Sequence, residues 1–493
     1  PPEQTDASVG RGRPWFRRPR VLVPLALGLA YAWTALWALP DYGLTWDEAW
    51  ENYYGDKVLN FYASGGDTAH LDMTLDTVAL HSVEAHPDLH QISNRFQNSD
   101  VITQPHLIWP LGPVLASASK YLFYHWLPCF GPYQAHHLAA LAAGLALVAA
   151  VFVFARRTCG WWPAVVAAVT LALYPRFWAH AHVNIKDTLS ALLFSLTLMV
   201  LYRGVHRRDW RRIAAAGVLT GFALAAKANA LFLPVVILPW FLTVLWQRRR
   251  RGQTLLGQGG WIALGLCPVL AVGVMFACWP LLWLEFPHNV TRYLDSLLSR
   301  GGGAGGHTIP LLSLRTAWAT MPPVVFILAV GGVIALGCRR RRLSTGLPLL
   351  LAGWLVVPLA RVSLPGMVDF DGIRHWLEFV PALALFAGLG GGWLLRGLFR
   401  RLAAATRSRP LAYGLPVLLL LAAWLPTGIW MIRNHPYQLT YYNALVGGLR
   451  GAQARGYPQS TDYWAASYLQ GLAWLNQNVA HEHPVLVVGV AEH

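Results

Sequence analysis

Charged residues are scarce in this sequence. Asp, Glu, Lys and Arg together make up 13% of its 493 residues, whereas about a quarter of an ordinary soluble domain is charged. The apolar runs are each close to the roughly 20 residues that an α-helix needs to cross about 30 Å of hydrocarbon. This composition excludes an ordinary soluble protein and predicts an all-α polytopic membrane protein.

Patterns that bind metals or nucleotides are also missing. The five cysteines show no paired spacing, and the 18 histidines form no HExxH motif. The sequence has neither a Rossmann fingerprint nor a Walker motif. We therefore expect no cofactor, disulfide framework or structural zinc site. The close pairs His136/His137 and His180/His182 leave a divalent metal as the less favoured alternative.

Basic residues are unevenly distributed, and the net charge is +16. A nucleic-acid-binding surface would gather them on one soluble module with aromatic partners. Cytoplasmic loops of membrane proteins are enriched in Lys and Arg, so short basic clusters between apolar runs predict inner loops and no nucleic-acid partner. Such clusters occur here at 11–20, 156–157, 203–212, 248–251, 339–342 and 396–409.

These clusters predict the topology of the chain. Residues 1–20 are expected to be a cytoplasmic basic tail, and residues 21–430 a transmembrane module of about eleven helices. No small-residue cleavage site follows the first apolar run, so we expect a retained first helix. An odd number of spans places the segment 431–493 outside. Outer loops are expected at 41–133, 280–320 and 361–375.

The expected helices have approximate bounds. They lie at about 21–40, 134–155, 161–178, 188–203, 213–226, 230–247, 261–279 and 411–430, with helix 8 before Arg339 and helices 9 and 10 flanking the loop 361–375. The apolar stretch 107–127 is expected to lie along the outer interface, because counting it as a span would turn the cluster 156–157 outward.

An acidic pair, Asp47 and Glu48, follows the first helix between Trp46 and Trp50. Carboxylates close to hydrocarbon are costly, so they usually have a function or a partner. We expect Asp47 to be a general base that deprotonates an acceptor hydroxyl or amine, with Glu48 positioning the acceptor or sharing charge. The alternative is a solvated helix cap.

Lys186 and Asp187 lie between the third and fourth helices. They either form one ion pair that caps the fourth helix or line a site, with Asp187 aiding the base and Lys186 facing a phosphate. Only four of the 39 basic side chains are lysines, yet Lys186 and Lys227 both fall at outer helix ends. Snorkelling is the alternative explanation for Lys227.

A third candidate cluster surrounds Arg374 and His375 at the start of the tenth helix. Arg374 can bind a phosphate through two hydrogen bonds, and a protonated His375 can assist departure of a leaving group. The alternative is a local Asp–Arg salt bridge with Asp369 or Asp371. If the phosphate interpretation holds, Lys186, Lys227 and Arg374 converge in one outward cavity with Asp47 on its opposite wall.

Several short motifs resemble the GT-C superfamily. The nearest group is glycosyltransferase family 39 with its bacterial relatives of the protein O-mannosyltransferase and aminoarabinose-transferase type. The motifs are Asp47-Glu48, Gln104-Pro-His-Leu107 in place of a His-Pro-Pro-Leu-like motif, Phe130-Gly131 and the hairpin 221–229. The segments 184–187, 371–375 and 435–443 are similar to poorly characterised bacterial members.

This resemblance implies a GT-C-type transmembrane helix bundle with outward-facing loops and juxtamembrane helices. It also implies inverting transfer of a sugar, mannosyltransferase-like, from a polyprenyl-phosphate donor to a protein, lipid or glycan acceptor at the outer face of the bacterial cytoplasmic membrane. Asp47 matches the catalytic base of such enzymes, whose outer-loop basic residues hold the lipid phosphate. The implied catalytic set is Asp47, Glu48 and Asp187, and the substrate-binding set is Lys186, Lys227, Arg374, His375 and His106.

Two other functional classes remain open at this point. A transporter or lipid-linked sugar flippase would place ionisable residues near mid-bilayer at broken helices, often in two related halves. We find no half-to-half repeat, and the ionisable residues group at one face. A polysaccharide polymerase or ligase would share the outer basic residues, but usually lacks the acidic pair.

The topology is testable by cysteine labelling in a background without the five native cysteines. A thiol reagent that does not cross membranes should label Gln477→Cys on intact cells, because the segment 431–493 is expected outside. Arg250→Cys should react only after lysis. Labelling of Gln477→Cys only after lysis contradicts the eleven-span topology.

Overall fold

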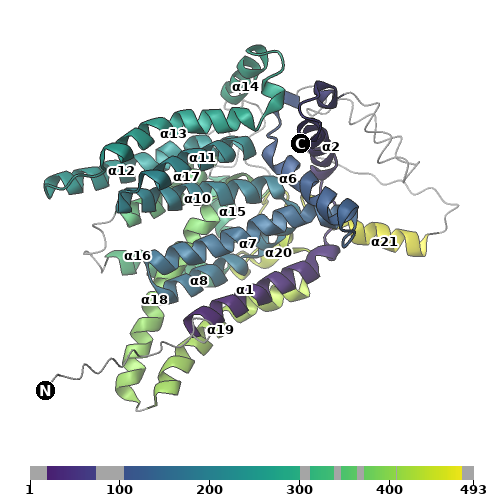
Figure 1. Cartoon of the computed structure of the whole chain (residues 1–493). Helices are drawn as coiled ribbons and strands as arrows, with labels where there is room; N and C mark the ends of the chain where they lie inside the picture. Colours follow the sequence, from purple (N-terminus) through teal and green to yellow (C-terminus); the bar gives the residue numbers. More distant parts are fainter. Residues whose placement is uncertain are drawn as a thin grey trace, which may run out of the picture.

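The structure is a computed structural model of the chain, and it describes residues 19–73, 105–299, 311–337, 346–363, 371–406 and 408–479. Within these ranges every regular element is helical, which confirms the predicted all-α class (Figure 1). The basic cluster 339–342, Asp369 and most of the tail 1–20 lie outside the described residues.

All eleven expected segments are helical. By length and composition, six described helices are able to cross a membrane, or up to eight if each of two bent pairs is one span. The expected count of about eleven spans therefore stays a prediction. The corresponding helices are α1 (Pro19–Ala38), α7 (Pro132–Thr158), α8 (Trp161–Ala172) with α9 (Pro175–Val183), α10 (Ile185–Arg207), α11 (Trp210–Ala226), α12 (Leu233–Arg250), α13 (Gln258–Ala277), α16 (Pro323–Gly337), α17 (Leu347–Val362), α18 (Phe379–Ala405) and α19 (Arg409–Arg433).

The expected continuous helix at 161–178 is wrong, because the chain breaks between α8 and α9. Pro175 has no N–H to continue α8, and it disfavours a helical conformation at Tyr174, whose backbone is extended. The two helices meet at 65°. The bend buries all of α9, including Arg176 and His180, beside the start of α10.

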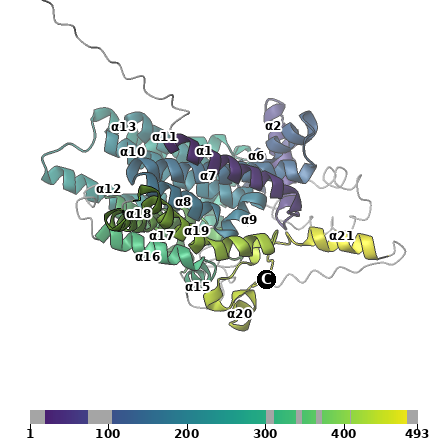
Figure 2. The same ribbon diagram turned by 90° about the horizontal axis from the view of Figure 1, so that it is seen from below.

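The chain also forms shorter helices between and after the long ones. They include α2 (Glu48–Ala63), α6 (Leu111–Lys120), α14 (His288–Ser299), α15 (Leu312–Ala319), α20 (Gly448–Ala454) and α21 (Tyr468–Asn478). In both views α2, α6 and α21 lie at the same end (Figure 1 and Figure 2). The stretch 107–127, expected along the interface, contains α6 and a six-residue π-helix, Tyr121–Trp126.

Glycine allows α18 to pack closely between α8 and α16. A Cβ atom on Gly390 would collide with the carbonyl oxygen of Leu328, and one on Gly332 would collide with that of Phe386. On the other side of α18, Gly388 faces the carbonyl oxygen of Pro163. Small residues bring helix backbones close together in membrane proteins, so this contact fixes α18 and the loop that precedes it.

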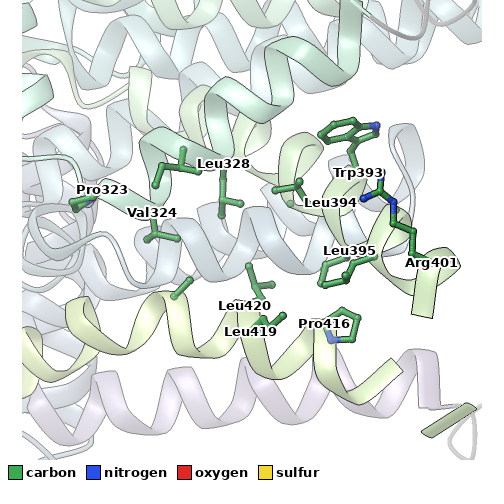
Figure 3. Close-up of a pocket in the computed structure, with 15 residues that line it drawn as sticks. Pro323, Val324, Leu328, Trp393, Leu394, Leu395, Arg401, Pro416, Leu419 and Leu420 are labelled. Carbon is green, nitrogen blue, oxygen red and sulfur yellow. The ribbon is translucent and has the colours of Figure 1, made fainter. Parts of the chain in front are cut away.

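An apolar cavity of about 710 Å³ lies between α16, α18 and α19 (Figure 3). Arg401 is its one charged lining residue, and Leu328, Leu394 and Leu420 contribute to its apolar walls. Leu394 and Arg401 lie roughly 22 Å and roughly 33 Å along α18 from its first residue, Phe379. This cavity is therefore remote from the polar residues that precede α18.

Overpacking at Gly390 should destabilise the bundle. Gly390→Ala should cost about 1–3 kcal/mol, because the new methyl group meets backbone atoms that cannot rotate away. Gly397→Ala, on the same helix with open space around it, is the matched control. Thermal unfolding in detergent should show a lower Tm for Gly390→Ala alone; equal Tm values contradict the close packing.

Candidate active site

Asp47 stands at the point where two cations meet. It occupies the N-cap position of α2, but its side chain makes no capping hydrogen bond. Instead, Lys186 Nζ and Arg374 Nη1 both donate to its Oδ2, at 3.1 Å and 3.2 Å. The alternative of a solvated helix cap is therefore wrong.

Lys186 bridges two carboxylates of α2. Its Nζ lies 2.8 Å from Glu51 Oε1, in addition to its contact with Asp47, and it lies over the ring of Trp50 at 4.9 Å. Asp47 and Glu51 are four residues apart, so they project from one face at the beginning of α2. Glu51 is not among the site residues predicted from the sequence. The spacing of the two acids would have revealed it, had α2 been recognised as a helix.

Asp187 pairs with Lys227 and not with Lys186. Lys227 Nζ donates to Asp187 Oδ1, Asn184 Nδ2 donates to Oδ2 at 2.8 Å, and Arg374 Nη1 lies 3.8 Å from Oδ2. Asn184 also caps α10, because its side chain accepts the backbone N–H of Asp187. The expected alternatives of a Lys186–Asp187 ion pair and of a snorkelling Lys227 are both wrong, since Lys227 is buried.

Arg374 connects three acidic side chains. It lies in a short 3₁₀ helix, η11 (Arg374–Trp376), after a turn in which Asp371 and Gly372 have positive φ values of 58° and 65°. Its Nε donates to Asp371 Oδ2 at 2.8 Å, so the local Asp–Arg salt bridge is present. The same guanidinium also reaches Asp47 and Asp187, and the salt bridge is therefore part of a larger cluster.

The cluster contains more acids than lysines and arginines. Lys186, Lys227 and Arg374 come together although nearly 190 residues separate the first and last of them. Asp47 was expected on the opposite wall of the cavity. Instead, it lies in direct contact with Lys186 and Arg374. A phosphate that binds here must take hydrogen bonds that carboxylates now accept. The paired carboxylates are Asp47, Glu51, Asp187 and Asp371.

The two carboxylates that share Lys186 have opposite pKa shifts. Burial disfavours the charge on Asp47, but the charges of Lys186 and Arg374 outweigh it and hold its pKa below the ordinary value. Burial raises the pKa of Glu51 to about 7, because Lys186 only partly compensates for the loss of water. Asp47 is therefore ionised at neutral pH, whereas Glu51 titrates near neutral pH.

His375 lies beside the cations and is buried. Its Nδ1 is 3.4 Å from Lys227 Nζ. Burial and the charges of Arg374 and Lys227 lower the pKa of His375 well below its usual range. This favours the neutral imidazole over the protonated form expected from the sequence.

Glu48 and His106 lie apart from this cluster. Glu48 points toward α7, where it pairs with His137 and accepts the backbone N–H of Thr45 at 2.8 Å. This contact attaches α2 to α7. His106 is buried near Arg292 and His288 of α14, and no hydrogen bond or ion pair joins it to the cluster in the described part of the chain. The expectation that both side chains line the site with Asp47 is not met.

The segment after α19 covers the cluster, a contact that the sequence analysis did not predict. The ring of Trp464 lies 5.0 Å from the Arg374 guanidinium, and Tyr463 Oη lies 3.2 Å from His180 Nε2. Gln459 Oε1 accepts the backbone N–H of Asp371 at 2.5 Å. Through residues 459–464, these contacts make the predicted outward segment 431–493 part of the site.

Polar residues at three helix ends support the loop that carries Arg374. Arg361, in the last turn of α17, donates to His375 O at 2.6 Å and to Asn229 Oδ1 at 2.7 Å. Asn229 Nδ2 in turn donates to Glu378 Oε1 at 2.5 Å. The loop before α18 is thereby tied to α17 and to the segment before α12. No group of three or more His, Cys, Asp or Glu able to hold a metal occurs among the described residues.

Breaking the Lys227–Asp187 pair should destabilise the protein. Lys227→Gln leaves a buried carboxylate with weaker compensation, at a cost of about 3 kcal/mol. Adding Asp187→Asn should recover part of this loss, because the resulting side chains are both neutral. Thermal unfolding measures both effects, with Lys57→Gln on α2 as a partly exposed control. A double variant less stable than the sum of the single effects contradicts the pairing.

Comparison with known proteins supports the same architecture. Residues 131–275 match the family described as dolichyl-phosphate-mannose-protein mannosyltransferase. None of the curated proteins matches the chain.

Solved structures give a broader match. ArnT from Cupriavidus metallidurans in the apo state is 16% identical, with a TM-score of 0.52 over 85% of this chain and 73% of that chain. The same protein bound to undecaprenyl phosphate is 17% identical, with a TM-score of 0.49 over 85% and 74%. The Archaeoglobus fulgidus oligosaccharyltransferase tethered with an acceptor peptide is 14% identical, with a TM-score of 0.43 over 76% and 49%. The chain therefore has a GT-C-type transmembrane helix bundle and resembles glycosyltransferase family 39, as its motifs predict.

Proposed function

We propose that this protein is an inverting glycosyltransferase that moves a sugar from a polyprenyl-phosphate donor to a protein, lipid or glycan acceptor at the outer face of the bacterial cytoplasmic membrane. The observation that carries this proposal is the convergence of Lys186, Lys227 and Arg374 on Asp47 and Asp187. The cluster lies where helix ends meet: the N-cap of α2, the start of α10, the end of α11 and the approach to α18.

The donor class follows from the cations. When the bond between the anomeric carbon and the phosphate oxygen breaks, the electron pair stays on the phosphate, whose negative charge increases. Preorganised cations stabilise that charge, and Arg374 offers a planar fork while the lysines offer point charges. The family match, named for a dolichyl-phosphate sugar, and the binding of undecaprenyl phosphate by ArnT support a polyprenyl-phosphate donor.

The acceptor step is assigned to Asp47. Its carboxylate takes the proton of the acceptor hydroxyl or amine while that oxygen or nitrogen attacks the anomeric carbon from the side opposite the phosphate. One bond forms as the other breaks, so the configuration at this carbon inverts. Lys186 and Arg374 keep Asp47 ionised at neutral pH, and Arg374 stays in contact with Asp47 when the donor phosphate binds Lys186.

The distribution of charges favours an enzyme over the transporter or flippase alternative. A transporter places its ionisable residues near mid-bilayer between related halves. Here the buried acids and cations join helix ends on one side of the bundle. The charged residue at the break between α8 and α9, Arg176, donates to Tyr441 O at 3.2 Å and lies over the rings of Tyr442 and Tyr463.

Loss of the proposed base should abolish turnover and preserve donor binding. Asp47→Asn should lower turnover on the order of 10²-fold or more, because the amide cannot accept the proton. Asp56→Asn is the matched control, since Asp56 lies on the same helix and pairs with Lys120. Turnover is followed as release of polyprenyl phosphate from polyprenyl-phosphate mannose, the first donor to test.

Two outcomes would contradict this assignment. Unchanged turnover in Asp47→Asn rules out Asp47 as the base. If the same loss occurs in Glu48→Gln but not in Asp47→Asn, the role passes to Glu48. Mass spectrometry of envelope proteins and glycolipids, with and without the enzyme, identifies the sugar and acceptor that the reaction joins. Identical glycoconjugates in both samples contradict a transferase.

A further inference from the structure

Glu51 and Asp47 share Lys186 but differ in their other partners. Asp47 also accepts a hydrogen bond from Arg374, whereas Lys186 is the cation that contacts Glu51 in the described part of the chain. The Glu51 side chain is buried, with 3% of its surface exposed. If Lys186 turns to another anion, Asp47 keeps one cation and Glu51 keeps none.

The other charged groups around Glu51 already have partners. On α2 itself, Glu48 pairs with His137 of α7, and Asp56 pairs with Lys120 of α6. The 3₁₀ helix Thr68–Leu71, which also packs against α2, contains His70 and is flanked by Asp67 and Asp72. Lys57, further along α2, lies over the ring of Tyr53, so among the described residues no second cation contacts Glu51 in place of Lys186.

We propose that Glu51 takes up a proton from solvent when the donor phosphate binds Lys186, so that donor binding and protonation of Glu51 occur together. This inference rests on the proposed function, because it requires an anionic phosphate at Lys186. The charge balance is simple: one negative charge enters with the phosphate diester and one positive charge enters with the proton. The net charge of the cluster is unchanged.

The cost of an unpaired buried charge explains the coupling. A buried carboxylate without water or a cation is strongly destabilised, and protonation removes this penalty. Burial already raises the pKa of Glu51 to about 7 with Lys186 in contact, and loss of that cation raises it further. Asp47 remains ionised beside Arg374 and available to the acceptor.

The coupling has a definite sign. Below about pH 7 Glu51 is already protonated, so donor affinity does not depend on pH. Above about pH 7, Glu51 must take up a proton from solvent when the donor binds, so the Kd of the donor rises by up to about tenfold per pH unit. His375 is neutral throughout this range, because burial and nearby cations lower its pKa.

The probe for this experiment is an isoprenyl methyl phosphodiester, because a diester phosphate keeps one negative charge between pH 6 and 9 and adds no titration of its own. Its Kd for the purified full chain is measured across this range. Calorimetry in two buffers of different ionisation enthalpy counts the protons taken up at pH 8, independently of any variant. We expect a Kd that rises above about pH 7 and an uptake approaching one proton.

Two variants assign the proton to Glu51. Glu51→Gln should bind with no pH dependence and no proton uptake, whereas Asp56→Asn, on the same helix, should behave as the wild type. Binding of the diester without pH dependence or proton uptake in the wild type overturns this inference and leaves the proposed donor class standing. A pH slope that persists in Glu51→Gln also overturns it. Failure of the diester to bind at any pH overturns both proposals.

Discussion

The shared ion pairs of Asp47 hold the site together. Lys186 lies 139 residues and Arg374 lies 327 residues further along the chain, yet both donate to the same carboxylate oxygen. In a weakly polar bundle, a buried charge without a partner costs several kcal/mol, so each member keeps the others in place. The segments that supply them, α2, α10 and the approach to α18, are constrained by electrostatics as much as by apolar packing.

Local backbone features deliver these side chains to one point. Pro175 ends α8 and turns α9 across the bundle, and Asn184 then starts α10 so that Lys186 and Asp187 fall in its first turn. Lys227 has an extended backbone at the end of α11, which directs the chain toward α12. The left-handed turn at Asp371 and Gly372 places Arg374 against them. Each charged residue thus follows a helix break that its own neighbours in the sequence create.

The sequence predicted the long apolar helical segments, apart from the break within 161–178, and all three cations of the cluster. Long apolar runs fix the helical segments, and the rarity of lysine drew attention to Lys186 and Lys227. Glu51 was not predicted because α2 mixes polar and apolar residues and lacks the long apolar run that revealed the other helices. The directions of Glu48 and His106 depend on how α2 and the segment before α6 pack against α7 and α14, which a linear pattern does not encode.

Lys186, Lys227 and Arg374 each already contact a carboxylate. These cations are held in position before the substrate arrives, so little reorganisation is needed when charge develops on the phosphate. The same carboxylates compete with that phosphate, and binding must therefore exchange one anion for another. Asp47 can lose Lys186 and stay ionised because Arg374 remains, whereas Lys186 is the one cation that contacts Glu51 among the residues that the structure describes. Asp47 and Glu51 are four residues apart on α2 but differ in their cation partners. When the phosphate binds Lys186, Asp47 therefore keeps its negative charge, whereas Glu51 takes up a proton.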